Sequence, residues 1–174
     1  MVTLPAETLS PEAFAPYGRV VDRPSRPSDS EGPGWRWWAE TALLAGDGRP
    51  WGIGYLDLQA AELRFDWAER HMRTLEAIVA TGRDLYVYVG PAEHPDEPRR
   101  VPALDRFRAF RVPSGCGVIM DRGVWHGAPL AAEGPTPALV LILEGTGRHD
   151  VTLVRFPDTP VAIDPGRPAT PQGG

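Results

Sequence analysis

Two separated segments of the chain carry the side chains that could bind a metal or take part in catalysis. The first reads Glu-Arg-His-Met-Arg-Thr-Leu-Glu from Glu69 to Glu76, and the second ends at His126. If the first segment begins in a strand, Glu69 and His71 project from the same face, because successive side chains alternate. Glu76 joins that face only where the chain turns around residues 72–74. Glu69 and His71 can therefore converge on one point, and a set of two imidazoles and two carboxylates forms there only if the fold also brings in Glu76 and His126.

Imidazoles and carboxylates together are ligands for divalent first-row metals. Such a set suits Mn, Fe, Ni, Co or Zn and leaves one or two positions open for water or substrate. The residue types do not choose among these metals. A simpler alternative is that the histidines are buried hydrogen-bonding residues with no metal.

Composition excludes several classes of function. The chain has 174 residues with 18 basic and 23 acidic side chains, a net charge of -5. It lacks the concentrated basic face that nucleic acids require, so we expect no nucleic-acid partner. Every basic residue is arginine, which excludes lysine Schiff-base chemistry, and the single cysteine excludes an internal disulfide. The N-terminus lacks the features of a signal peptide, so we predict a cytoplasmic protein without a membrane partner.

Short strands must position these residues. Apolar side chains recur mainly with a period of two in six segments. These segments are 52–58, 63–67, 85–89, 117–120, 138–143 and 151–156. With 20 prolines and 19 glycines, long helices have little room, and the pattern favours an all-β sandwich or barrel. Ser10 followed by Pro11 predicts one short helix near the N-terminus.

The chain length fits one domain, which we place at residues 1–163. Within it, the polar residues 22–34 predict a flexible loop, and the Pro- and Gly-rich residues 164–174 predict a disordered tail. The cluster Trp35–Trp38 follows the loop. These tryptophans would serve as a lid over a substrate or, as we favour, lie buried in the core or a dimer interface.

The two chemical segments resemble the paired motifs of the cupin superfamily. The first cupin motif reads H-x-H, three or four residues, Glu and later Gly; here Glu69 replaces the first histidine, followed by His71, Glu76 and Gly82. The second motif reads P-x-G-x-x-H and matches residues 121–126, with aspartate in place of proline.

Within the cupins, the chain is similar to the ureidoglycolate lyase family across most of its length. The matching stretches are residues 9–18, 69–71, 105–110 and 122–126, of which the last, R-G-V-W-H, is the most specific. The resemblance implies a cupin-type double-stranded β-helix, or jelly-roll barrel, that forms a homodimer. It also implies an enzyme that releases urea from ureidoglycolate to give glyoxylate.

The resemblance also implies roles for individual residues. His71, His126, Glu76 and Glu69 would bind the divalent metal, and Glu69 would alternatively act as the catalytic base. Arg122 would bind the substrate carboxylate through its guanidinium fork, or form a surface salt bridge instead. Glu76 stands where the family has glutamine, which makes the ligand set more anionic.

Five further residues are candidates for the substrate pocket: Tyr86, Tyr88, Ile119, Met120 and Trp125. The two tyrosines would line the barrel or cover its outside, since parity does not choose the face. Together these features predict a metal-dependent lyase that cleaves a C–N bond of a small carboxylate-bearing ureido or related substrate. The alternatives are a cupin isomerase, hydratase or oxygenase acting on a more apolar metabolite, and a non-catalytic cupin that binds a small molecule.

Overall fold

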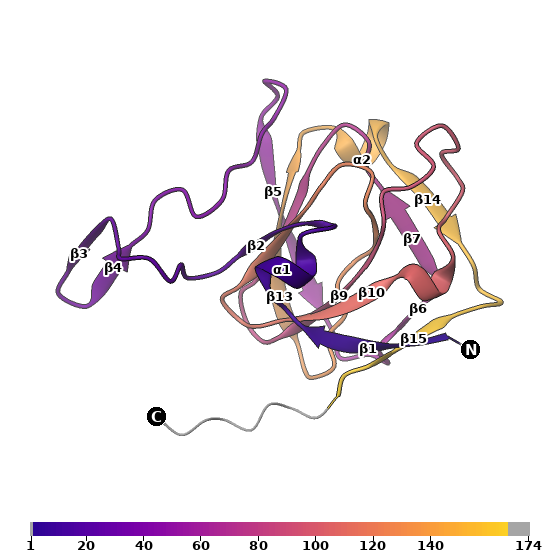
Figure 1. The fold of residues 1–174 in the computed structure, drawn as a ribbon, viewed down its shortest axis with the longest axis horizontal. Helices are drawn as coiled ribbons and strands as arrows, with labels where there is room; N and C mark the ends of the chain where they lie inside the picture. Colours follow the sequence, from indigo (N-terminus) through magenta and orange to yellow (C-terminus); the bar gives the residue numbers. More distant parts are fainter. Residues whose placement is uncertain (1, 167–174) are drawn as a thin grey trace.

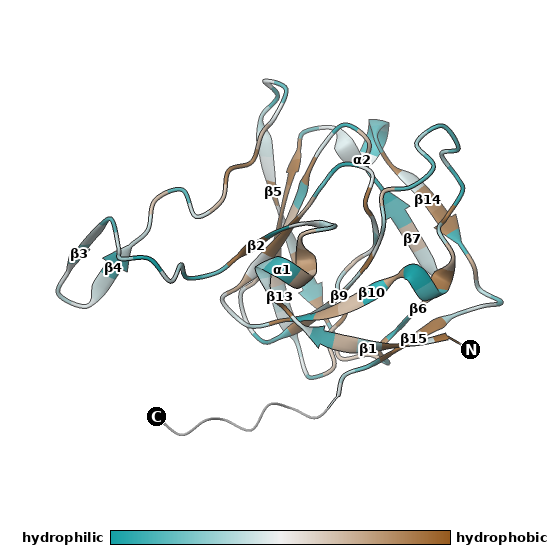
Figure 2. Cartoon of the chain, viewed as in Figure 1, coloured by the Kyte–Doolittle hydropathy of each residue, from teal (hydrophilic) through white to brown (hydrophobic). Residues whose placement is uncertain are grey.

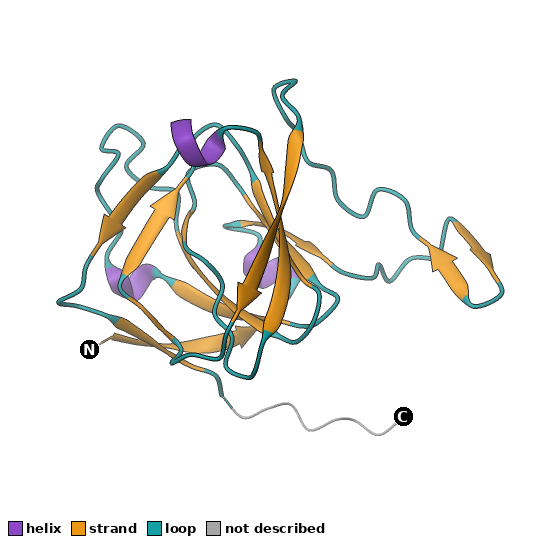
Figure 3. Cartoon of the chain, turned by 180° about the vertical axis from the view of Figure 1, so that it is seen from behind, coloured by secondary structure: helices purple, strands orange, loops and turns teal. Residues whose placement is uncertain are grey.

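A computed structural model describes residues 2–166 of the chain. Strands dominate this part (Figure 3), and its helical segments are short: α1 (Pro11–Phe14), the 3-10 turn η1 (Leu104–Arg106) and α2 (Thr146–His149). The all-β, cupin-like class predicted from the sequence is confirmed. No helix within residues 2–166 has both the length and the apolar character needed to cross a membrane.

Two curled sheets form the wall of a half-barrel. The larger has the strand order β14-β7-β12-β9-β10-β1-β15-β6, and the smaller has the order β2-β11-β8-β13-β5. The larger sheet consists of β1 (Val2–Thr8), β6 (Arg64–Phe65), β7 (Trp67–Arg70), β9 (Leu85–Gly90), β10 (Arg108–Val112), β12 (Trp125–His126), β14 (Thr152–Arg155) and β15 (Val161–Asp164). The smaller consists of β2 (Gly18–Val21), β5 (Trp51–Leu58), β8 (Glu76–Ala80), β11 (Gly117–Met120) and β13 (Thr136–Leu143). Figure 1 shows the two sheets facing each other across a shared interior.

The main hydrophobic core lies between these sheets. The larger sheet contributes Val87 and Phe110, and the smaller sheet contributes Ile78 and Val118, all almost fully buried. Phe14 of α1 packs edge-on against Phe110 with ring centroids 5.2 Å apart, so the short helix closes one side of this core.

Strand β9 is buried on both faces and separates two cores. Val87 and Val89 face the interior between the sheets. Tyr86 and Tyr88 face a second cluster, which includes Phe65 and residues of β1 and β15. Because the strand is covered on both sides, its alternating aliphatic and tyrosine residues are buried at every position.

The helix and the central strands agree with the sequence pattern. Ser10 caps α1 by accepting a hydrogen bond from the Ala13 amide at 3.1 Å, as its position before a proline predicted. The period-of-two segments recover β5, β9, β11, β13 and β14 to within about two residues. Strands β1, β2, β8, β10 and β15 were not predicted. They are short or interrupted by proline, and their pairing partners are distant in the sequence.

The segment expected as a flexible loop is partly ordered as a hairpin. Strands β3 (Ser30–Gly32) and β4 (Trp35–Trp37) pair across a turn in which Gly34 has a φ of 82°. A proline-glycine turn between short strands is a hairpin signal that outweighs the polar composition. The hairpin projects away from the barrel (Figure 1 and Figure 2), and its two tryptophans are 53% and 59% exposed. Their expected burial in the core is therefore wrong.

The expected disordered tail begins at a residue that belongs to the barrel. Asp164 ends β15, which pairs in parallel with β1. Most of the remaining tail, residues 167–174, lies outside the described part of the chain.

Candidate metal centre

Four side chains from three neighbouring strands converge inside the half-barrel. Glu69 lies on β7, His71 directly follows that strand, Glu76 opens β8 and His126 ends β12. Glu69 and His126 are directly paired across β7 and β12, so both side chains point to the same face. The pairing of His126 with Val89 identifies this face as the interior.

The connection between β7 and β8 brings Glu76 to the same place. β7 belongs to the larger sheet and β8 to the smaller, so residues 71–75 cross from one wall of the barrel to the other. The chain therefore turns where the sequence required a turn for Glu76 to join Glu69 and His71. Glu76 pairs with Met120 and faces the interior across from the histidines.

The donor atoms lie close together. One ligand atom each from Glu69, His71 and His126 lies within 4.8 Å of the other two. Glu76 Oε2 lies 3.0 Å from His71 Nε2 and 3.5 Å from His126 Nε2. The two imidazole centroids are 5.0 Å apart.

Backbone carbonyls fix the orientation of both imidazoles. His71 Nδ1 lies 2.7 Å from the Asp150 carbonyl, and His126 Nδ1 lies 2.9 Å from the Val124 carbonyl. Because a carbonyl oxygen only accepts, each Nδ1 carries a hydrogen and donates it. Each Nε2 therefore points to the shared centre, which is the arrangement found in histidines that bind metals.

The Glu76 carboxylate and the two imidazoles shift one another's pKa values in opposite directions. Burial by itself would raise the pKa of Glu76, but the imidazoles of His126 and His71 hold it well below its usual range. Burial by itself would lower the pKa of His126, but the Glu76 carboxylate raises it above its ordinary value. The buried Nε2 of His126 makes no hydrogen bond within the described structure, since the contact with Glu76 is too long.

These residues fit a divalent first-row cation. Two Nε2 lone pairs and two carboxylates offer mixed nitrogen and oxygen donors, the set that Zn, Fe, Ni, Co and Mn accept. A cation there would engage the orphaned Nε2 of His126 and neutralise the two half-buried carboxylates.

A pocket of about 240 Å³ opens beside this centre. Its lining residues are Gly54, Tyr55, Leu56, Glu69, Glu76, Ala128, Pro129 and Val140. Within the described residues, Glu69 and Glu76 supply the only charges of the lining. The pocket lies at the edge strand β5, where the smaller sheet leaves the half-barrel open.

Three of the predicted pocket residues lie on the other side of the larger sheet. Tyr86, Tyr88 and Trp125 belong to the second core. Tyr88 stacks on Phe65 with ring centroids 3.8 Å apart and donates a hydrogen bond to the Trp67 carbonyl at 3.0 Å. They are packing residues, because their parity along the strand is opposite to that of the inward-facing Val89 and His126.

The other two predicted pocket residues also fall outside the lining. Ile119 faces the outer side of the smaller sheet, where it packs with Leu75 and Ala77. Met120 faces inward but is enclosed in the main core. The apolar side of the pocket comes instead from β5 and β13 and from the loop after His126, a combination that requires the tertiary structure.

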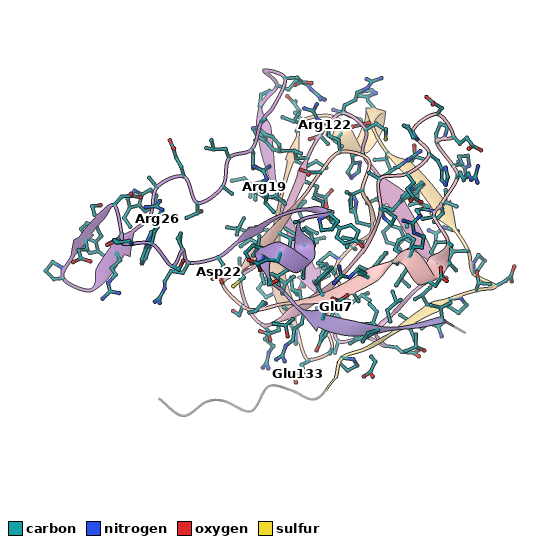
Figure 4. All side chains as sticks on the ribbon, in the orientation of Figure 1. Glu7, Arg19, Asp22, Arg26, Arg122 and Glu133 are labelled. Carbon is teal, nitrogen blue, oxygen red and sulfur yellow. The ribbon has the colours of Figure 1, made fainter. Side chains whose placement is uncertain are left out.

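Arg122 lies in the turn before β12, and its side chain is exposed. It does not line the pocket, and within residues 2–166 it forms no ion pair, so the alternative of a surface salt bridge is not realised. Figure 4 shows it at the upper edge of the barrel in that view. Binding of a substrate carboxylate by Arg122 stays a prediction.

The arginine between Glu69 and His71 has a structural function that the sequence did not reveal. Arg70 is 1% exposed and donates hydrogen bonds to the carbonyls of Glu93, His94 and Glu97. Its guanidinium lies 4.7 Å from the ring centroid of Trp125. Because side chains alternate along β7, Glu69 points into the half-barrel and Arg70 points to the opposite face of the sheet. There Arg70 is buried and holds the loop at residues 93–97.

Comparison with known proteins agrees with these findings. A family model described as ureidoglycolate lyase matches residues 1–164. No curated protein matches the chain.

Gly127, which directly follows β12, lies in close contact with Tyr88 of the second core. A Cβ atom on Gly127 would lie 1.7 Å from the Tyr88 hydroxyl oxygen, and stacking and a hydrogen bond prevent Tyr88 from moving. We expect Gly127→Ala to lower the free energy of unfolding by about 1–3 kcal/mol, measured by urea denaturation. The control is Gly147→Ala in α2, where a Cβ would meet no atom within 4 Å. Equal stability of the two variants would contradict the tight packing.

Proposed function

The chain belongs to the ureidoglycolate lyase family, and from this membership we propose that it is a metal-dependent lyase. The proposed reaction is the cleavage of a C–N bond in a small carboxylate-bearing ureido compound or a related substrate. The observation that carries the proposal is the convergence of the His71 and His126 Nε2 atoms with Glu69 and Glu76 beside a pocket.

His71 and His126 would hold the cation together with Glu76, which leaves Glu69 as the base. When bound, a divalent cation acts as a Lewis acid that lowers the pKa of a coordinated hydroxyl group. The carbonyls of Asp150 and Val124 keep both Nε2 atoms directed at the centre, so the donors are oriented before the ion arrives. This preorganisation reduces the cost of binding.

Glu69 is the residue that we assign to proton transfer. It lines the pocket, whereas Glu76 is already engaged by His71 at 3.0 Å. Glu69 accepts the hydroxyl proton as the O–H electrons form a carbonyl group. The C–N bond breaks with its electron pair on nitrogen, and the nitrogen takes the proton back from Glu69. With ureidoglycolate the products are glyoxylate and urea.

The apolar part of the lining favours a second candidate function. Leu56, Pro129 and Val140 offer no hydrogen bonds to a ureido group. The same centre in an isomerase, hydratase or oxygenase would act on a more apolar metabolite. Oxygen consumption by the iron-loaded protein distinguishes an oxygenase from the lyase, because C–N cleavage of the proposed kind consumes no oxygen.

The metal assignment predicts a sharp effect of removing one imidazole. We expect purified His126→Ala to lose bound first-row metal and to retain no more than about one hundredth of the lyase activity. His149→Ala serves as the control, because His149 is exposed in α2. Elemental analysis and urea release from ureidoglycolate are the measurements. Stoichiometric metal in His126→Ala would contradict the proposed site.

The raised pKa of His126 predicts a pH dependence of metal binding. Because Glu76 raises the pKa of His126 by stabilising the charged imidazolium, an incoming cation must displace a proton at pH values below that raised pKa. The affinity for Zn²⁺ should rise with pH, by up to about tenfold per pH unit for each proton released. Calorimetric titration in two buffers of different ionisation enthalpy counts these protons. Heats that do not depend on the buffer would contradict the prediction.

We also propose that the protein forms a homodimer, as the family resemblance implied. The outer face of the smaller sheet supports this proposal: Ile53 and Tyr55 are 71% and 69% exposed and pair with Leu141 and Leu139. A large exposed apolar patch is typical of an interaction surface. We expect Ile53→Asp to shift a dimer to a monomer in sedimentation equilibrium. A wild-type monomer at all concentrations would contradict the proposal.

A further inference from the structure

Asp150 holds the crossing between the two sheets through its carboxylate. It follows α2 and precedes β14, next to the end of β7. Its Oδ1 accepts a hydrogen bond from the Met72 amide at 3.0 Å, and its Oδ2 accepts one from the Arg73 amide at 2.7 Å. Both carboxylate oxygens are thus used on consecutive amides of the crossing segment.

The backbone of the same residue holds the imidazole of His71. The Asp150 carbonyl accepts the hydrogen of His71 Nδ1 at 2.7 Å. The other end of this region is fixed independently, because the Gly123 amide donates to the His71 carbonyl at 2.7 Å. Asp150 therefore determines both the path of the backbone after His71 and the tautomer of its ring.

The carboxylate of Asp150 is held by two charge-assisted hydrogen bonds from the crossing segment.

We propose that Asp150 is a positioning residue of the metal centre, which rests on the proposed function. By accepting hydrogen bonds from the Met72 and Arg73 amides, Asp150 fixes the path of residues 71–75 between the two sheets. This path allows His71 and Glu76 to face the same point. Asp150 does not touch a substrate or the metal. It acts through His71 and through the backbone that leads to Glu76.

The test compares Asp150→Asn with Asp158→Asn, an exposed carboxylate in the turn between β14 and β15. In Asp150→Asn the new side-chain amide places a donor against a backbone amide hydrogen, and the negative charge is removed. We expect a 10- to 100-fold lower affinity for Zn²⁺, about the size found for residues that orient metal ligands, and no change in the control. Asp150→Glu keeps both acceptor oxygens and should retain more of the affinity.

A second measurement on metal-free protein separates positioning from general stability. Two-bond ¹H–¹⁵N spectra report the tautomer of His71, and hydrogen exchange reports the amides of Met72 and Arg73. In folded Asp150→Asn we expect partial loss of the hydrogen from His71 Nδ1 and faster exchange of both amides. A wild-type tautomer together with wild-type Zn²⁺ affinity would overturn the inference.

The two proposals fail in different ways. Wild-type protein that binds no Zn²⁺ contradicts the proposed function, and the tautomer and exchange measurements then decide the role of Asp150. Wild-type binding that Asp150→Asn leaves intact, with an unchanged tautomer, contradicts the role of Asp150 alone.

Discussion

The placement of two carboxylates against two buried imidazoles is the constraint on which this structure depends. His71 and His126 are 4% and 2% exposed, and Glu76 lies against both. Charges in such surroundings are costly unless they are compensated, so the barrel must hold the four groups in one arrangement. In each ring, Nδ1 donates a hydrogen bond to a backbone carbonyl, and this bond fixes the ring so that Nε2 points to the centre.

The two sheets divide this task between them. The larger sheet brings Glu69 and His126 together by direct cross-strand pairing. The smaller sheet supplies Glu76, and the crossing at residues 71–75 joins the two contributions. The main core between the sheets fixes their separation, while the second core behind β9 fixes the orientation of β12 through Trp125 and Tyr88. The positions of the four side chains therefore depend on the packing on both sides of the larger sheet.

Sequence reasoning identified five of the strands and the four converging side chains but not the pocket. Alternation shows that Glu69 and His71 share a face, and the turn before Glu76 followed from parity alone. Alternation does not tell which face is the interior, so Tyr86 and Tyr88 were candidates until the pairing of β9 with β12 placed them outside. The Asp150 carbonyl and the Gly54 backbone could not be predicted as parts of the site, because every residue type has the same backbone groups. Their roles arise from contacts between segments far apart in the chain.

The arm between β2 and β5 leaves the barrel, and the β3–β4 hairpin lies at its far point (Figure 1). Ala42 and Leu44, near the return to β5, pack against the smaller sheet. Because β5 pairs along its whole length with β13, the position of β5 does not depend on the hairpin. Insertions and deletions in the β3–β4 hairpin should therefore leave the metal centre unchanged. Differences in size between relatives should concentrate there, and new specificities of association could be acquired there without altering the chemistry inside.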